Sequence, residues 1–158
     1  MTNTHLILTV SLALLLAGCD SNALVDRYHE LPQKGWTYDQ TVVDTLEITQ
    51  PEFYHQAYAN LRINADYPYQ NIYLKLNITA PDGKTTNEVI SVPLAENSGK
   101  WLGSGIWNVI TFQSPILHRK YFDQKGKYRI EIEQNMRLES LPSVEAVGIR
   151  VEQQEEIY

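Results

Sequence analysis

The most constraining feature of this sequence is a strict alternation of apolar and polar residues near its middle. From residue 72 to residue 79, every even position holds Ile or Leu, and every odd position holds Tyr, Lys, Asn or Thr. Successive side chains of a β-strand point to opposite faces, so this period of two predicts a strand with one face in a core. A chain built from such strands must bury their apolar faces against a second layer.

Similar segments recur along the chain. We expect strands near 41–49, 59–64, 72–79, 87–92, 128–133 and 146–152. Pro81-Asp82-Gly83-Lys84 reads as the tight turn after 72–79. Pro115 lies in a further segment, which we place at a sheet edge because proline cannot donate to a neighbouring strand. With about seven or eight such strands and no convincing core helix, the sequence predicts an all-β fold, an antiparallel β-sandwich that is jelly-roll-like.

The first 18 residues read as a leader. The apolar run 6–16 is shorter than the stretch of about 20 residues that a membrane-spanning helix needs, so it fits the core of a signal peptide. The run ends in Leu16-Ala17-Gly18-Cys19, which resembles a bacterial lipobox and implies cleavage after Gly18 and a lipid thioether on Cys19. The segment before the run carries no Lys or Arg, which departs from the usual pattern. The alternative is an ordinary secreted protein with a coincidental cysteine.

Removing the leader leaves roughly 140 residues, the usual size of one domain. We divide the chain into a signal peptide (1–18), a lipid anchor and polar tether (19–34), and a single β-sandwich domain (35–158). The apolar residues of the tether have near-helical spacing, which allows either one or two helical turns or an irregular segment docked on the body. The net charge of −6 argues against nucleic acid and anionic lipid head groups as ligands.

No catalytic or metal-binding motif stands out. His29, His55 and His118 are far apart and lack the spacing of metal ligands. No serine occupies a Gly-x-Ser-x-Gly motif. We therefore expect neither an enzyme nor a site for a metal or a cofactor.

Aromatic residues are the candidates for an interaction surface. We select Trp101, Trp107, Tyr67 and Tyr69, because tyrosine and tryptophan are enriched at interfaces. A sugar-binding protein would place two aromatics in one exposed cleft beside Asp or Asn. An assembly protein would instead show an apolar patch with a polar rim.

Taken in order, several stretches resemble the gliding-motility lipoprotein family GldH of the Bacteroidota. They cover most of residues 19–152 and include Cys19-Asp-Ser-Asn, Leu31-Pro32, Gly35-Trp36, Leu61-Arg62-Ile63-Asn64, Asp66-Tyr67-Pro68-Tyr69-Gln70-Asn71, Pro81-Asp82-Gly83-Lys84, Lys100-Trp101-Leu102-Gly103-Ser104-Gly105, Gln134-Asn135-Met136-Arg137 and Val147-Gly148-Ile149-Arg150-Val151.

The resemblance implies a non-enzymatic lipoprotein of the cell envelope, associated with the gliding machinery and with protein secretion linked to it. Its expected partners are a membrane, bound through the lipid, and other envelope proteins of a motility or secretion complex. The expected location is the outer membrane, on its periplasmic side. The alternative function is a surface lipoprotein whose sandwich binds carbohydrate.

Overall fold

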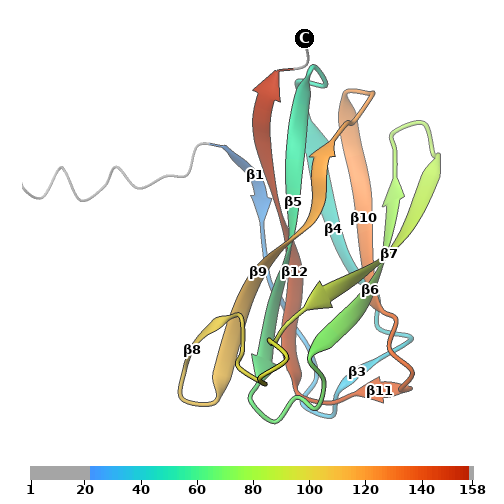
Figure 1. Cartoon of the computed structure of the whole chain (residues 1–158). Helices are drawn as coiled ribbons and strands as arrows, with labels where there is room; N and C mark the ends of the chain where they lie inside the picture. Colours follow the sequence, from blue (N-terminus) through green and yellow to red (C-terminus); the bar gives the residue numbers. More distant parts are fainter. Residues whose placement is uncertain (1–21, 157–158) are drawn as a thin grey trace, which may run out of the picture.

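The computed structural model describes residues 22–156, which form twelve strands and no helix (Figure 1). Accordingly, this part of the chain holds no helix that could span a bilayer. The strands are β1 (Ala23–Asp26), β2 (His29–Glu30), β3 (Trp36–Thr37), β4 (Val42–Ile48), β5 (Phe53–Asn64), β6 (Asn71–Thr79), β7 (Thr85–Pro93), β8 (Ser104–Ile106), β9 (Val109–Lys120), β10 (Gly126–Gln134), β11 (Ser140–Leu141) and β12 (Val144–Glu156).

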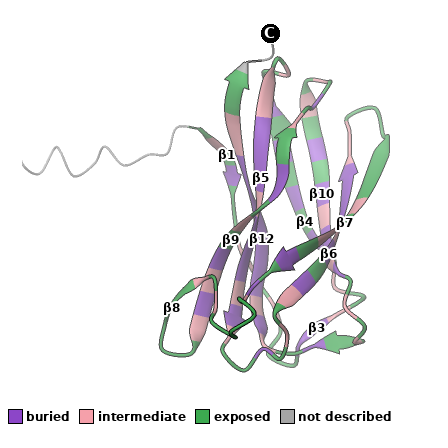
Figure 2. Ribbon diagram, viewed as in Figure 1, coloured by how far each residue is buried: buried purple, intermediate pink, exposed green. Residues whose placement is uncertain are grey.

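Two antiparallel sheets make up the body of the protein. The larger sheet has the order β1-β12-β5-β9-β8, with β2 also paired to β12, and the smaller sheet has the order β4-β10-β6-β7. The buried residues of Figure 2 lie along the strands of both sheets and form one hydrophobic core. Long strands that follow one another in sequence mostly belong to different sheets, so the chain repeatedly crosses the sandwich. The predicted all-β, antiparallel sandwich is confirmed.

The alternating segment at the middle of the sequence forms β6. Its even-numbered residues are buried, with Ile72 and Leu74 at 0% exposure, whereas Tyr73 faces solvent. The predicted hairpin to β7 is also confirmed: the Ala80 N–H donates to the Lys84 carbonyl at 2.8 Å. Gly83 supplies the left-handed conformation of this turn, with φ of +86°.

Pro115 lies in β9, at the point where the ladder with β5 is irregular. Tyr58 pairs with Pro115 and Ala57 pairs with Leu117, so one extra residue bulges out of β9. On its other side β9 pairs with β8 only through residues 109–111. Among the described strands, β9 pairs at Pro115 with β5 alone, so the edge position predicted for this segment is found locally.

The segment assigned to a tether, 19–34, contains two strands of the larger sheet. β1 and β2 both pair with β12, so the folded body begins at about residue 22 rather than at residue 35. The chain forms strands here instead of helical turns. The pairing register with β12 is the same in both strands, from Asp26 opposite Arg150 to His29 opposite Val147. The apolar alternation is hidden in the sequence because Arg27 and His29 are polar and contact the buried Asp44.

A third, two-stranded sheet is formed by β3 and β11. It holds Trp36, which is fully buried and donates its indole N–H to the Gln40 carbonyl at 2.7 Å. Sequence periodicity could not reveal this sheet, because two residues are too few to show a period.

Candidate functional site

The buried carboxylate of Asp44 joins the N-terminal segment to the facing sheet. Asp44 occupies an inward position of β4, and its side chain is 1% exposed. It accepts a hydrogen bond from His29 Nε2 at 2.9 Å and another from Arg27 Nη1 at 3.3 Å. A carboxylate taken out of water is costly unless it is paired, so these contacts fix residues 27–29 in place.

A second set of polar contacts holds the same segment to the outer face of the larger sheet. The Arg150 guanidinium, itself largely buried, contacts the Asp26 carboxylate at 2.6 Å. Asn60, at 0% exposure, donates from Nδ2 to Asp26 Oδ1 at 2.7 Å and to the Arg27 carbonyl at 3.1 Å. We call Asp26, Arg27, His29, Asp44, Asn60 and Arg150 the N-terminal clamp.

The clamp determines where the described chain leaves the sandwich. The Gln153 N–H donates to the Asn22 carbonyl at 2.9 Å, so residue 22 lies beside the C-terminal part of β12. Cys19, the predicted lipidation site, lies outside the described residues. Only two residues separate it in the sequence from Asn22.

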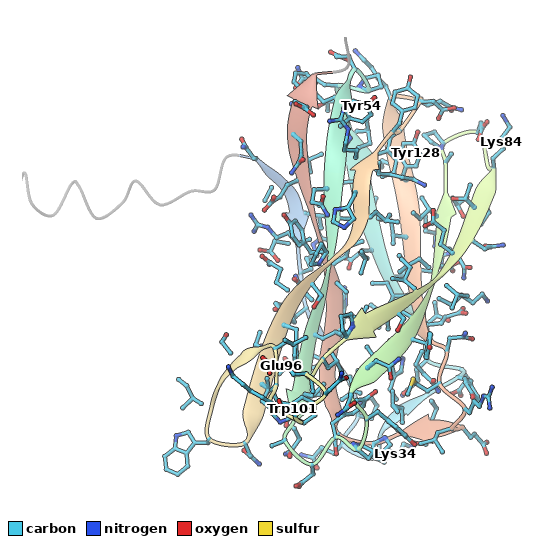
Figure 3. The ribbon with its side chains drawn as sticks, viewed as in Figure 1. Lys34, Tyr54, Lys84, Glu96, Trp101 and Tyr128 are labelled. Carbon is cyan, nitrogen blue, oxygen red and sulfur yellow. The ribbon has the colours of Figure 1, made fainter. Side chains whose placement is uncertain are left out.

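The four aromatic residues selected from the sequence do not form one surface. Trp107 is 99% exposed in the turn between β8 and β9, whereas Trp101 bridges to Ala95 and packs partly buried against the core. Figure 3 shows Trp101 at the same end of the sandwich as Lys34 and opposite Tyr54. These two tryptophans therefore differ in exposure and do not belong to one surface.

Tyr67 and Tyr69 do lie together, with ring centroids 5.7 Å apart in an edge-to-face arrangement. Tyr67 is buried, which raises the pKa of its hydroxyl, and that hydroxyl donates to the Asn71 carbonyl at 3.1 Å. Tyr67 is thus a core residue and cannot itself contact a ligand, whereas Tyr69 reaches the surface.

Tyr69 helps to line a groove of about 480 Å³. The other lining residues are Tyr73, Val89, Asn135, Met136, Arg137 and Leu138. The segment 135–138 is held over β6 by a hydrogen bond from the Asn135 N–H to the Tyr73 carbonyl at 2.8 Å. The groove thus combines two tyrosines with an exposed amide and an exposed guanidinium, an arrangement that could bind a small polar ligand with a flat apolar face.

The histidines have separate structural environments. His29 belongs to the clamp, His118 Nδ1 contacts Gln56 Oε1 at 3.1 Å, and His55 packs edge-to-face on Phe122 with ring centroids 5.2 Å apart. Within residues 22–156, no group of three or more His, Cys, Asp or Glu could hold a metal ion.

Comparison with known proteins assigns the family. The family described as GldH lipoprotein matches residues 23–151, a span that runs from β1 into β12. The chain belongs to the GldH lipoprotein family. The matched span includes the whole N-terminal clamp and the β8–β9 turn.

Two relatives of this GldH family member align over most of their length. A gliding motility lipoprotein GldH homolog from Christiangramia forsetii is 28% identical over 88% of this chain and 89% of its own. The gliding motility lipoprotein GldH from Flavobacterium johnsoniae is also 28% identical, over 90% of this chain and 92% of its own. No solved structure matches the chain at a significant level.

Sequence reasoning missed the clamp of this GldH family member, although two signals were present. Asp44 is a charged residue at an apolar-facing position of an alternating segment, which marks a buried carboxylate. Gly148 interrupts a strand of Val and Ile, and a glycine inside a strand often marks a close backbone approach. The partners of both residues come from distant segments, so the pattern alone could not name them.

We expect His55 to make the protein less stable in acid. Burial lowers the pKa of His55, with weaker opposition from the carbonyl groups of Lys120 and Phe53. The unfolded chain, with a histidine pKa of about 6.5, then binds this proton more readily than the folded chain. The contribution of His55 to the stability of the folded protein is therefore fully present above about pH 6.5 and declines as the pH falls below that value.

Urea unfolding of the wild type and of His55→Leu, measured between pH 7.5 and pH 5, checks this expectation. The difference in stability should shift in favour of the leucine variant as the pH falls. Parallel pH profiles of the two proteins would show that His55 does not contribute.

Proposed function

We propose that this chain is a non-catalytic lipoprotein, anchored to a membrane of the cell envelope through Cys19, that serves the gliding-motility machinery. The observation that carries the proposal is the alignment with two gliding motility lipoproteins over about nine-tenths of each chain. The lipobox-like sequence Leu16-Ala17-Gly18-Cys19, just before the matched span, supports the anchor.

The use of the buried polar groups supports a non-enzymatic role. Asp44 contacts His29 across the sandwich, and Asn60 and Arg150 contact Asp26 on the outer face of the larger sheet. Buried polar groups that are hydrogen-bonded to other parts of the protein stabilise the fold and are not available to bind a substrate. The protein thereby presents a rigid β-sandwich beside its anchor, as an assembly component should.

We place the anchor in the outer membrane, with the domain on the periplasmic side, and we expect its partners among other envelope proteins of the motility or linked secretion complex. The acidic domain, with a net charge of −6, would be repelled by an anionic membrane surface. That repulsion favours a domain that stands away from the bilayer and contacts proteins.

Deletion of the gene in the native host tests the proposal. We expect the deletion strain to spread poorly on agar, or to secrete and assemble surface proteins poorly if the host does not glide. Complementation with the wild-type gene should restore the phenotype. A deletion strain that spreads and secretes normally would contradict the proposal.

The second candidate function is carbohydrate binding in the groove between Tyr69 and Tyr73. The observation that favours it is two tyrosines in one exposed groove beside Asn135. In that case the deletion strain would move normally and grow poorly on one polysaccharide, and Tyr73→Ala would reproduce the growth defect.

A further inference from the structure

The turn between β8 and β9 presents the most exposed apolar side chains of the described chain. Trp107 is 99% exposed and Ile106 is 77% exposed. Ile106 pairs with Val109, so Trp107 and Asn108 form a two-residue turn. We call Ile106 and Trp107 the hairpin tip. Exposure of an indole next to an isoleucine has no benefit for the folding of the chain.

The backbone of the hairpin tip is also unfavourable for a tryptophan. Trp107 has a φ of 62°, a conformation in which bulky residues are rare. The turns preferred in two-residue hairpins need a positive φ at this first position, where Gly, Asn or Asp is normally found. Folding alone would therefore favour glycine at position 107. A tryptophan at this position is unfavourable both because its indole is exposed to water and because its backbone has a positive φ. We infer that the side chain has a function other than folding.

The hairpin tip lies at the end of the closely packed hairpin that β8 and β9 form. A methyl group added at Gly105 would lie 2.2 Å from the Val109 carbonyl, and one at Gly103 would lie 2.6 Å from the Thr111 carbonyl. The Ala65 N–H also donates to the Asn108 carbonyl at 2.7 Å. These contacts hold the turn against β9 and β5. The backbone that carries the indole is therefore already fixed before a partner binds, which lowers the entropic cost of association.

The hairpin tip and the point where the chain approaches Cys19 lie at different ends of the larger sheet (Figure 1). Asn22 lies beside Gln153, which pairs with His55, whereas Val109 pairs with Asn64. Nine residues of β5 separate these positions, which corresponds to about 30 Å. The three residue steps from Cys19 to Asn22 can span at most about 11 Å.

We propose that the hairpin tip inserts into an apolar pocket of a second envelope protein, at the end of the sandwich that is far from the lipid anchor. This inference rests on the proposed function, because it assumes the anchor at Cys19. Trp107 is the central anchor of the contact, and Ile106 packs at its side. The pocket is lined by aliphatic or aromatic side chains and offers an acceptor for the indole N–H.

The charge pattern favours a protein over a bilayer as the occupant. Residues 103–113 contain no Lys or Arg, whereas segments that insert into membranes usually carry basic residues that contact the head groups. The position of the tip also favours a protein, since a short tether holds the opposite end of the sheet at the membrane.

The three tryptophans allow a direct test by radical oxidation and mass spectrometry. Trp36 is fully buried, Trp101 is partly buried and Trp107 is exposed, so the first two serve as internal references. The full-length lipoprotein is oxidised in native cell envelopes and, purified, in proteoliposomes of host lipids. Enclosure by a partner should slow oxidation of Trp107 at least about tenfold in the envelopes, because anchor tryptophans are shielded from water. In the proteoliposomes Trp107 should react freely.

Both other outcomes overturn the proposal. Protection in envelopes and proteoliposomes alike would identify the bilayer as the occupant. Free reaction in both would show that nothing covers the tip. This readout needs no motility phenotype, so its failure is distinct from failure of the proposed function.

A substitution of Trp107 tests whether the contact is needed for function. Trp107→Gly retains the turn conformation, so we expect unchanged abundance, membrane association and thermal stability, together with a loss of spreading or secretion close to that of the deletion strain. Tyr121→Ala removes another exposed aromatic and serves as the matched control. Full function of Trp107→Gly would contradict the proposal.

Discussion

Replacing Cys19 with serine is expected to move nearly all of the protein from the membrane fraction to the soluble fraction. Buried acyl chains contribute about 0.8 kcal/mol per CH₂ group, and two or more chains make attachment stable. The described residues contain no helix that could span the bilayer in their place. Fractionation of cells and incorporation of radiolabelled palmitate would measure both effects.

The same variant should reproduce much of the deletion phenotype. A membrane anchor raises the effective concentration of the domain near its partners, and that advantage is lost when the anchor is removed. Tyr121→Ala is the control, because it should remain lipidated, membrane-bound and functional. Unchanged palmitate labelling of Cys19→Ser would refute the lipobox interpretation. A wild type that incorporates no palmitate would point to the ordinary secreted protein.

Replacing Gly148 with alanine is expected to cost about 2–3 kcal/mol of folding free energy, because overpacking at a rigid contact forces the backbone apart. The added methyl group would lie 2.0 Å from the Arg27 carbonyl and 3.0 Å from the Tyr28 Cα. Both neighbours are main-chain atoms, so no side-chain rotation can relieve the clash. Residues 27 and 28 must move away from β12, which disturbs the clamp contacts of the neighbouring Asp26 and His29.

Urea unfolding would measure the loss of stability, and limited proteolysis would show whether residues 22–30 become cleavable. Gly83→Ala is the matched control, since no atom lies within 4 Å of the added methyl group. Its positive φ should cost about 1 kcal/mol and leave the N-terminal segment protected. Equal losses in the two variants, with no new cleavage near residue 27, would contradict the role of Gly148.

Much of the fold could be predicted because the local pattern reports which side of a strand is buried. The alternation in 72–79 identified β6, and Pro81-Asp82-Gly83-Lys84 identified its hairpin, since both signals need only neighbouring residues. Pro115 likewise indicated an edge, because its missing N–H is a property of the residue itself. The N-terminal strands were missed because Arg27 and His29, which contact the buried Asp44, put polar residues where a half-buried strand usually has apolar ones.

The sequence by itself determined the fold class and the main hairpin, both of which follow from spacing along the chain. The leader and the lipid on Cys19 stay predictions of the sequence. Only the tertiary structure decided that Tyr67 is buried while Trp107 is exposed, although both are aromatic residues near turns. It also decided that Asp26 meets Arg150, 124 positions away. Exposure and pairing depend on which segments the folded sheets bring together, and no local period carries that information.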